Sequence, residues 1–160
     1  SLVSAYPIIG VDVHKFKLTL GKKFGLTHAI KFSKKDFKKK LMHILQNRFA
    51  DVVIETTGNS EMIELAYSVT AASGKTILVG VPNKNINIYS LPLHFNKILT
   101  GSHGGNCKPD IDIPRYIKLL STKKINLNEI ITHEYPLENI NDAISTLRKG
   151  QAGRVIIKMD

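Results

Sequence analysis

The stretch YPIIGVDV, residues 6–13, gives the first indication of the fold. Its apolar and β-branched residues form a run long enough for a buried strand, as in a parallel sheet. Asp12 lies at the carboxyl end of this run. In a doubly wound sheet, an acidic residue at that position can accept hydrogen bonds from a ribose hydroxyl pair. An aspartate there can equally cap the next helix, so these residues alone leave both roles of Asp12 open.

Helical and strand patterns alternate after this run. The predicted helices cover residues 14–24, 33–48 and 59–72, and the predicted strands cover residues 27–32, 51–55 and 75–81. Gly25 and Gly74 are placed to end helices, and Asn59 or Ser60 to begin one. Ser33 and Asp36 have the spacing of a short capping box. This alternation predicts an α/β fold with a parallel sheet covered by helices.

The pattern changes after Pro82, where residues 83–96 form a longer polar connection. A strand over 97–101 and a glycine-rich loop over 102–109 follow. The next helix begins at Asp110 and is expected to turn Ile113, Ile117 and Leu120 inward. The remaining predicted elements are a strand over 130–133, a helix over 138–149 and a strand over 153–159.

The composition limits the class of protein. Hydrophobic residues make up 42% of the 160 residues, which predicts a folded chain. No apolar run approaches the ~20 residues of a membrane-spanning helix, and no signal segment is visible, so we expect a cytoplasmic protein without a membrane partner. Cys107 is the single cysteine, which excludes a disulfide framework and a multi-cysteine zinc site. The chain does not begin with Met, so we expect a piece of a longer protein.

The formal net charge is +10. A basic, non-enzymatic module that binds nucleic acid or another protein is therefore one alternative, based on this charge and on the lysines of residues 34–40. Lysine on a solvated helix face explains the same charge, and base-edge readers usually favour arginine. We therefore expect no nucleic-acid partner. Steep loss of nucleic-acid binding with salt would support the alternative.

Several runs resemble, in the right order, segments of the medium-chain, zinc-type alcohol dehydrogenase family. The run IIGVDVHKFKLTLGKKFGLTHAI is similar to the second strand, helix and third strand of that family. ADVVIETTGN is similar to its fourth strand and turn, and GKTILVGVP to its fifth strand. GSHGGN, IITHEYPLENINDAISTLRKG and GRVIIK are similar to its later segments. The resemblance covers nearly the whole chain and points to the C-terminal half of the family.

The resemblance implies a Rossmann-like doubly wound sheet whose first strand and glycine loop, G-x-G-x-x-G, would precede the chain. Residues 1–102 would be a partial dinucleotide-binding domain, and residues 103–160 a C-terminal segment that packs with a catalytic domain absent here. In the strand order 3-2-1-4-5-6, losing strand 1 separates strands 6–13 and 27–32 from the later three and exposes apolar edges. We expect strand 6–13 to pair with strand 51–55, or another chain to cover the edges.

The family also implies roles for matched residues. Asp12 and Lys17 would bind the adenosine ribose, and Arg154 would reach the pyrophosphate. Thr56 and Thr57 would lie along the cofactor, and Val79 and Val81 would offer backbone groups to the nicotinamide carboxamide. Each residue also has a simpler interpretation: Lys17 as surface, Val79 as core, and Arg154 as a local ion pair.

The implied activity is hydride transfer between an alcohol or polyol and nicotinamide, with zinc polarising the oxygen in the whole enzyme. The Asp12 carboxylate repels a 2′-phosphate, which favours NAD over NADP. The family's zinc ligands belong to the absent domain, so we predict no catalytic residue and no metal ligand here, and no activity for the chain alone. His103 is not expected to be catalytic. A homodimer is expected at the sheet edge between Lys97 and Gly101.

Another α/β nucleotide binder, such as a methyltransferase, is a further alternative, because an acid after the second strand holds a ribose there too. The runs GKTILVGVP and GRVIIK favour the dehydrogenase. Binding of NADH but not of S-adenosylmethionine would separate these two hypotheses.

Overall fold

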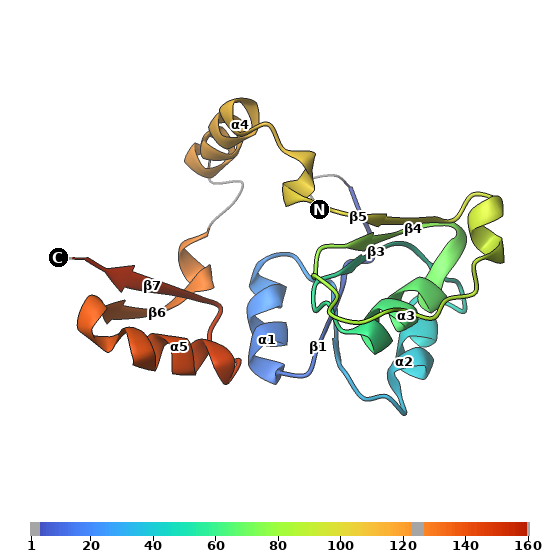
Figure 1. Cartoon of the computed structure of the whole chain (residues 1–160), viewed down its shortest axis with the longest axis horizontal. Coiled ribbons are helices and arrows are strands. Elements are labelled where there is room, and N and C mark those ends of the chain that lie inside the picture. The colour runs from blue at the N-terminus through green and yellow to red at the C-terminus, as the bar shows by residue number, and fades with distance from the viewer. Residues whose placement is uncertain (1–3, 123–126, 160) are drawn as a thin grey trace. The chain divides into compact units, whose positions relative to one another are not determined.

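The computed structural model describes residues 4–122 and 127–159 (Figure 1). The chain divides into two compact units. One unit is continuous and spans Leu41–Lys108, and the other contains the described residues before and after it.

The discontinuous unit begins with β1 (Ile9–Asp12), α1 (Lys15–Lys23) and β2 (His28–Lys31). The two strands pair in parallel, with Asp12 opposite Lys31. Gly25 has a φ of 97° and follows the last turn of α1, because a left-handed residue there ends a helix cheaply only when it is glycine. The predicted strand–helix–strand order and the role of Gly25 are confirmed.

The same unit contains α4 (Pro109–Ser121), β6 (Ile131–Pro136), α5 (Ile140–Arg148) and β7 (Arg154–Lys158), with β6 and β7 parallel. Short 3₁₀ helices, η3 (Asn128–Ile130) and η4 (Leu137–Asn139), precede β6 and α5. Lys23 Nζ of α1 lies 2.5 Å from Glu129 Oε2 of η3, so an ion pair joins these two helices.

The predicted inward face of α4 is wrong for Ile113 and Ile117, whose side chains are exposed, and Leu120 is only half-buried. The physical reason is that α4 has no fully buried residue within the described part of the chain, so nothing covers its apolar stripe.

The continuous unit has a three-stranded sheet. α2 (Phe37–Ile44) crosses the boundary between the units after Lys40. The elements that follow it are β3 (Ala50–Glu55), α3 (Ser60–Val69), β4 (Thr70–Leu78), η1 (Leu91–His94), β5 (Ile98–Gly101) and η2 (Gly104–Asn106). The strands run in parallel in the order β3-β4-β5. Ile63 of α3 and Thr76 of β4 are completely buried and mark its core. Asn59 begins α3 as predicted, and its side-chain oxygen accepts a hydrogen bond from the Met62 N–H at 3.2 Å.

Several predicted boundaries are wrong: strand 75–81 begins at Thr70, helix 33–48 begins at Phe37 and strand 130–133 continues to Pro136. Helix 59–72 ends at Val69, and Gly74 lies inside β4 instead of stopping the helix. A Cβ on Gly74 would lie 2.7 Å from the Asp51 carbonyl oxygen, so Gly74 permits a close approach to β3 where the register shifts. Strand 75–81 ends at Leu78, and helix 33–48 ends at Ile44, before the left-handed residues Gln46 and Asn47.

The predicted separation of the strands is confirmed. β1 and β2 form one sheet and β3, β4 and β5 another, and apolar side chains on β1 and β3 are exposed, among them Val11, Val52 and Ile54. The predicted pairing of strand 6–13 with strand 51–55 is wrong for the described residues. β1 and β3 belong to different compact units, and each sheet has its own helix packed against it.

Across residues 4–122 and 127–159, no helix has the length and apolar character that crossing a membrane requires.

Candidate functional site

A buried carboxylate organises the turn that follows β3. Glu55 is the last residue of that strand and its side chain is 5% exposed. Its Oε1 accepts a 2.7 Å hydrogen bond from the Thr57 N–H and a short one from the Thr57 hydroxyl. Its Oε2 accepts a 3.0 Å hydrogen bond from the Gly58 N–H. The strand end and residues 56–58 are therefore held as one rigid turn.

A second turn, after β4, lies against the first. The N–H groups of Val79 and Gly80 donate hydrogen bonds of 2.8 and 3.1 Å to the backbone carbonyl of Glu55. A Cβ on Gly80 would lie 2.1 Å from Gly58 N, and a Cβ on Gly58 would lie 2.3 Å from the Val81 carbonyl oxygen. Only glycine at both positions lets the two backbones come this close.

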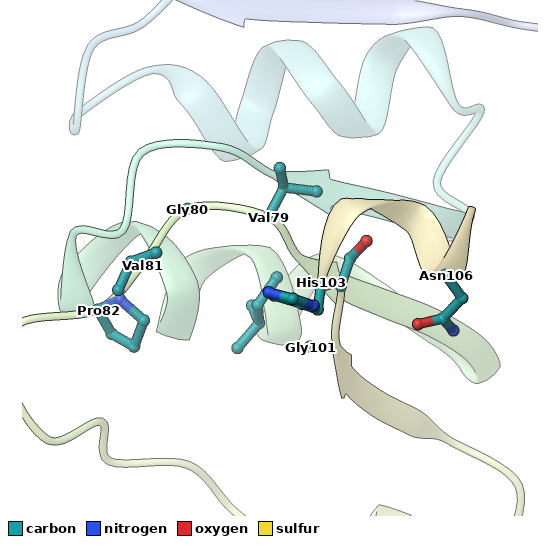
Figure 2. A pocket seen from close by; sticks show the side chains of 9 residues that line it. Val79, Gly80, Val81, Pro82, Gly101, His103 and Asn106 are labelled. Carbon is teal, nitrogen blue, oxygen red and sulfur yellow. The ribbon is translucent and has the colours of Figure 1, made fainter. Parts of the chain in front are cut away.

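A pocket of about 470 Å³ opens beside the second turn and the loop after β5. The pocket is shallow and open, and its lining is mostly apolar with a few polar side chains. Val79 and Val81 are 48% and 87% exposed. Figure 2 shows the His103 ring directed toward the side formed by Val81 and Pro82. The lining residues are Leu78, Val79, Gly80, Val81, Pro82, Gly101, Ser102, His103 and Asn106.

A buried lysine supports the segment that leads into β5. Lys97 is 8% exposed; its Nζ donates a 2.7 Å hydrogen bond to the Thr70 carbonyl and lies 4.2 Å from the centroid of the Tyr67 ring. Burial lowers the pKa of Lys97. Burial also raises the pKa of Tyr67, whose hydroxyl donates a 3.0 Å hydrogen bond to the Tyr89 carbonyl. Both groups hold the connection between β4 and β5 on α3.

In the discontinuous unit, Asp12 ends β1 and is half-buried. Its Oδ1 accepts a 2.7 Å hydrogen bond from the His14 N–H, so the carboxylate does stabilise the start of α1. Lys17 lies one turn into α1 and is half-buried, and Arg154 begins β7 and is exposed. Their roles toward a ligand stay predictions.

The seven predicted site residues therefore fall into two groups. Thr56, Thr57, Val79 and Val81 come together at the paired turns of the continuous unit. Asp12, Lys17 and Arg154 belong to the other unit. The sequence reasoning missed Glu55, although a charged residue ending the apolar run DVVIE, followed by the hydrogen-bond donors of Thr-Thr-Gly, could have signalled it. It also gave little weight to His103, which lines the pocket.

A family model described as zinc-binding dehydrogenase matches residues 3–122. Alcohol dehydrogenase 2 of Zea mays is 35% identical over 99% of the chain and 43% of its own length. Alcohol dehydrogenase 2 of Oryza sativa subsp. japonica is 36% identical with the same coverage. The chain thus spans less than half the length of these curated relatives.

Among solved structures, benzyl alcohol dehydrogenase from Acinetobacter calcoaceticus is 26% identical, with a TM-score of 0.87 over 99% of the chain and 44% of that protein. An alcohol dehydrogenase zinc-binding domain protein from Burkholderia ambifaria, at 23% identity, has a TM-score of 0.89 over 99% of the chain and 43% of that protein. This second likeness concerns the fold alone.

Proposed function

Because the chain belongs to the zinc-binding dehydrogenase family, we propose that it forms part of an enzyme that transfers hydride between an alcohol or polyol and a nicotinamide cofactor. The names of its plant relatives, alcohol dehydrogenases, support this reaction class over a methyltransferase. The chain would supply cofactor-binding surface, and the reacting centre would need residues beyond it.

The two turns beside the pocket, one with Gly58 and one with Gly80, support this proposal most strongly. The Val79 N–H is already engaged by the Glu55 carbonyl, so the Val79 carbonyl is the backbone group left to accept a hydrogen bond from a carboxamide. The apolar pocket beside Val79 suits one face of a flat ring. Gly58 and Gly80 remove the side chains that would push the two turns apart. These features fit the nicotinamide end of the cofactor.

Asp12 supports NAD over NADP. Its Oδ1 is used by the His14 N–H, and a carboxylate has further acceptor sites for a ribose hydroxyl pair. Its negative charge would repel a 2′-phosphate. We propose Lys17 as a second ribose contact and Arg154 as a pyrophosphate contact, because a guanidinium can hold two phosphate oxygens at once.

Zinc would polarise the alcohol oxygen in the whole enzyme. The described residues do not fit it, because no three His, Cys, Asp or Glu side chains gather among them as a metal site would require. We therefore assign no step through zinc to this chain, and we expect the 160-residue chain alone not to reduce NAD with an alcohol.

We also propose that residues 1–102 belong to the dinucleotide-binding domain of the parent fold and residues 103–160 to a segment that packs with its catalytic domain.

The enzyme is proposed to form a homodimer through β5. In support, β5 ends its sheet in the described part of the chain, and large apolar side chains of β5 and of the segment before it are exposed: Tyr89, Leu91, Leu93, Phe95 and Ile98. Sedimentation of Ile98→Lys tests this: the variant should be monomeric where the unaltered chain dimerises, and equal association of the two would contradict a β5 interface.

Fluorescence titration with NADH tests the proposed function. We expect NADH to bind the chain, AMP to compete for the adenosine end, and S-adenosylmethionine to leave the signal unchanged. S-adenosylmethionine binding in place of NADH would overturn the proposal.

A further inference from the structure

Glu55 is the one residue of the described site that bonds to both turns at once. Its backbone carbonyl accepts from the N–H groups of Val79 and Gly80, at 2.8 and 3.1 Å. Its carboxylate accepts from the N–H groups of Thr57 and Gly58, at 2.7 and 3.0 Å, and from the Thr57 hydroxyl. The five hydrogen bonds set the turn after β3 and the turn after β4 in one fixed arrangement.

We propose that Glu55 is a positioning residue for the nicotinamide: it acts through the two turns and sets the direction of the Val79 carbonyl without touching the cofactor. This inference rests on the proposed function and deepens it. A shift of the first turn would pass directly to the second, because Gly58 and Val81 meet backbone to backbone. An ordered carbonyl is bound at lower entropic cost than one that the ligand must first fix.

The chemistry requires a carboxylate at this place. Oε1 and Oε2 both face N–H donors, and an ionised carboxylate is an acceptor at both oxygens. Glutamine is nearly the same size but presents an NH₂ group at one of them. Whichever way the amide is turned, that NH₂ meets the N–H of Thr57 or of Gly58, donor against donor.

The location of the charge also argues for a special role. A buried carboxylate is costly unless it is well bonded, and within residues 4–122 and 127–159 no Lys, Arg or His forms an ion pair with Glu55. A short turn can be stabilised more cheaply by an Asp, Asn or Ser side chain at the surface. We therefore take the buried Glu55 carboxylate as a sign that the arrangement of the two turns serves ligand binding as well as stability.

The test compares Glu55→Gln with Glu64→Gln. Glu64 is the matched control, since its Oε1 accepts one backbone N–H, from Asn87 at 2.8 Å, on α3 outside the pocket. Nicotinamide mononucleotide and AMP are titrated separately into ¹⁵N-labelled full chain, and amide shifts are followed at Val79, Val81 and His14. Losing a charge-assisted hydrogen bond should raise the Kd for nicotinamide mononucleotide about tenfold in Glu55→Gln. Glu64→Gln should leave that Kd unchanged, and both variants should bind AMP like the unaltered chain.

If Glu55→Gln does not fold, Thr57→Val is compared with Thr57→Ser, because only Thr57→Val loses the hydroxyl that donates to Glu55 and accepts a 3.1 Å hydrogen bond from the Asn59 N–H. Thr57→Val should bind nicotinamide mononucleotide about threefold more weakly than Thr57→Ser, as expected when the hydrogen bonds of the hydroxyl are lost. Equal affinities in the folded variant and the unaltered chain would overturn the positioning role alone, and so would equal losses for AMP and nicotinamide mononucleotide. Absence of shifts at Val79 in the unaltered chain would overturn the proposed function, and the inference with it.

Discussion

The Asp12 carboxylate accepts a 2.7 Å hydrogen bond from the His14 N–H. The residue proposed to bind ribose therefore also holds the junction between β1 and α1. The two roles that the sequence left open are compatible, because the His14 N–H occupies one acceptor position of Oδ1 and a carboxylate has about four. Substitution can separate the two roles.

Asp12→Asn keeps an oxygen for the His14 N–H but removes the charge. Its unfolding free energy should differ from that of the unaltered chain by less than about 0.5 kcal/mol, because the Asn side-chain oxygen can accept the same turn hydrogen bond two residues along the chain. The affinity for AMP should fall about tenfold, because a charge-assisted bond to the ribose is lost. The ratio of the affinities for AMP and for 2′-phospho-AMP should also fall, because the charge that repels the 2′-phosphate is gone. Asp12→Ala should lose the same affinity and also about 1 kcal/mol of stability, as expected for one lost hydrogen bond. Unchanged AMP affinity in Asp12→Asn would limit this residue to holding the turn between β1 and α1.

Gly80→Ala should destabilise the chain by about 1–3 kcal/mol in chemical denaturation, as expected for overpacking. The new Cβ would lie 2.1 Å from Gly58 N, and because this neighbour is a backbone atom it cannot move aside as a flexible side chain would. Gly101→Ala is the control, since a Cβ there would have nothing within 4 Å. A control variant as unstable as Gly80→Ala would show that the close approach of the turns is not the cause.

Lys97→Met should change how stability depends on pH. Burial lowers the pKa of Lys97 below its ordinary 10.5, so just below that pH the folded chain holds fewer protons than the unfolded chain. Unfolding free energy then rises with pH through this interval, and Lys97→Met lacks that contribution. The stability of the unaltered chain minus that of Lys97→Met should grow as pH is raised toward 10.5. Lys38→Met, at an exposed lysine, controls for loss of a surface charge. A difference that shrinks with rising pH would contradict the burial argument.

Val52→Glu should reduce self-association of the chain, measured by light scattering. Val52 is 56% exposed on β3 and lies opposite Lys75 of β4, so the new carboxylate gains a partner and charges an outer strand. Ile117→Glu on α4, at a residue 59% exposed, is the matched change away from any strand. Ile117→Glu should reduce self-association less than Val52→Glu does. A larger reduction by Ile117→Glu would place the self-associating surface on α4.

Much of the fold could be predicted because its signals are local. Gly25, the Asn59 cap and the alternating apolar runs each act over a few residues, and the two positions and the order of the runs were predicted correctly although several boundaries were not. Gly74 was not, because its role depends on the carbonyl of Asp51 in the neighbouring strand. The exposed stripe of α4 was missed because helical spacing shows an apolar face but not whether anything covers it.

The residues of the candidate site show the same difference between what the sequence alone indicates and what only the folded structure reveals. Val79, Val81 and Thr57 could be named from the family resemblance. Glu55 could not, because its importance comes from N–H groups in two turns that only the folded sheet brings together.

The paired turns of the continuous unit and, in the other unit, the end of β1 are each proposed to bind nicotinamide cofactor. Titration of ¹⁵N-labelled chain with NADH, mapped residue by residue, measures this binding. Saturable amide shifts should appear at Thr57, Val79 and Val81, and also at residues 12–17. Shifts confined to other surfaces, such as the lysines of residues 34–40, or a complete lack of saturable shifts, would show that neither surface binds the cofactor.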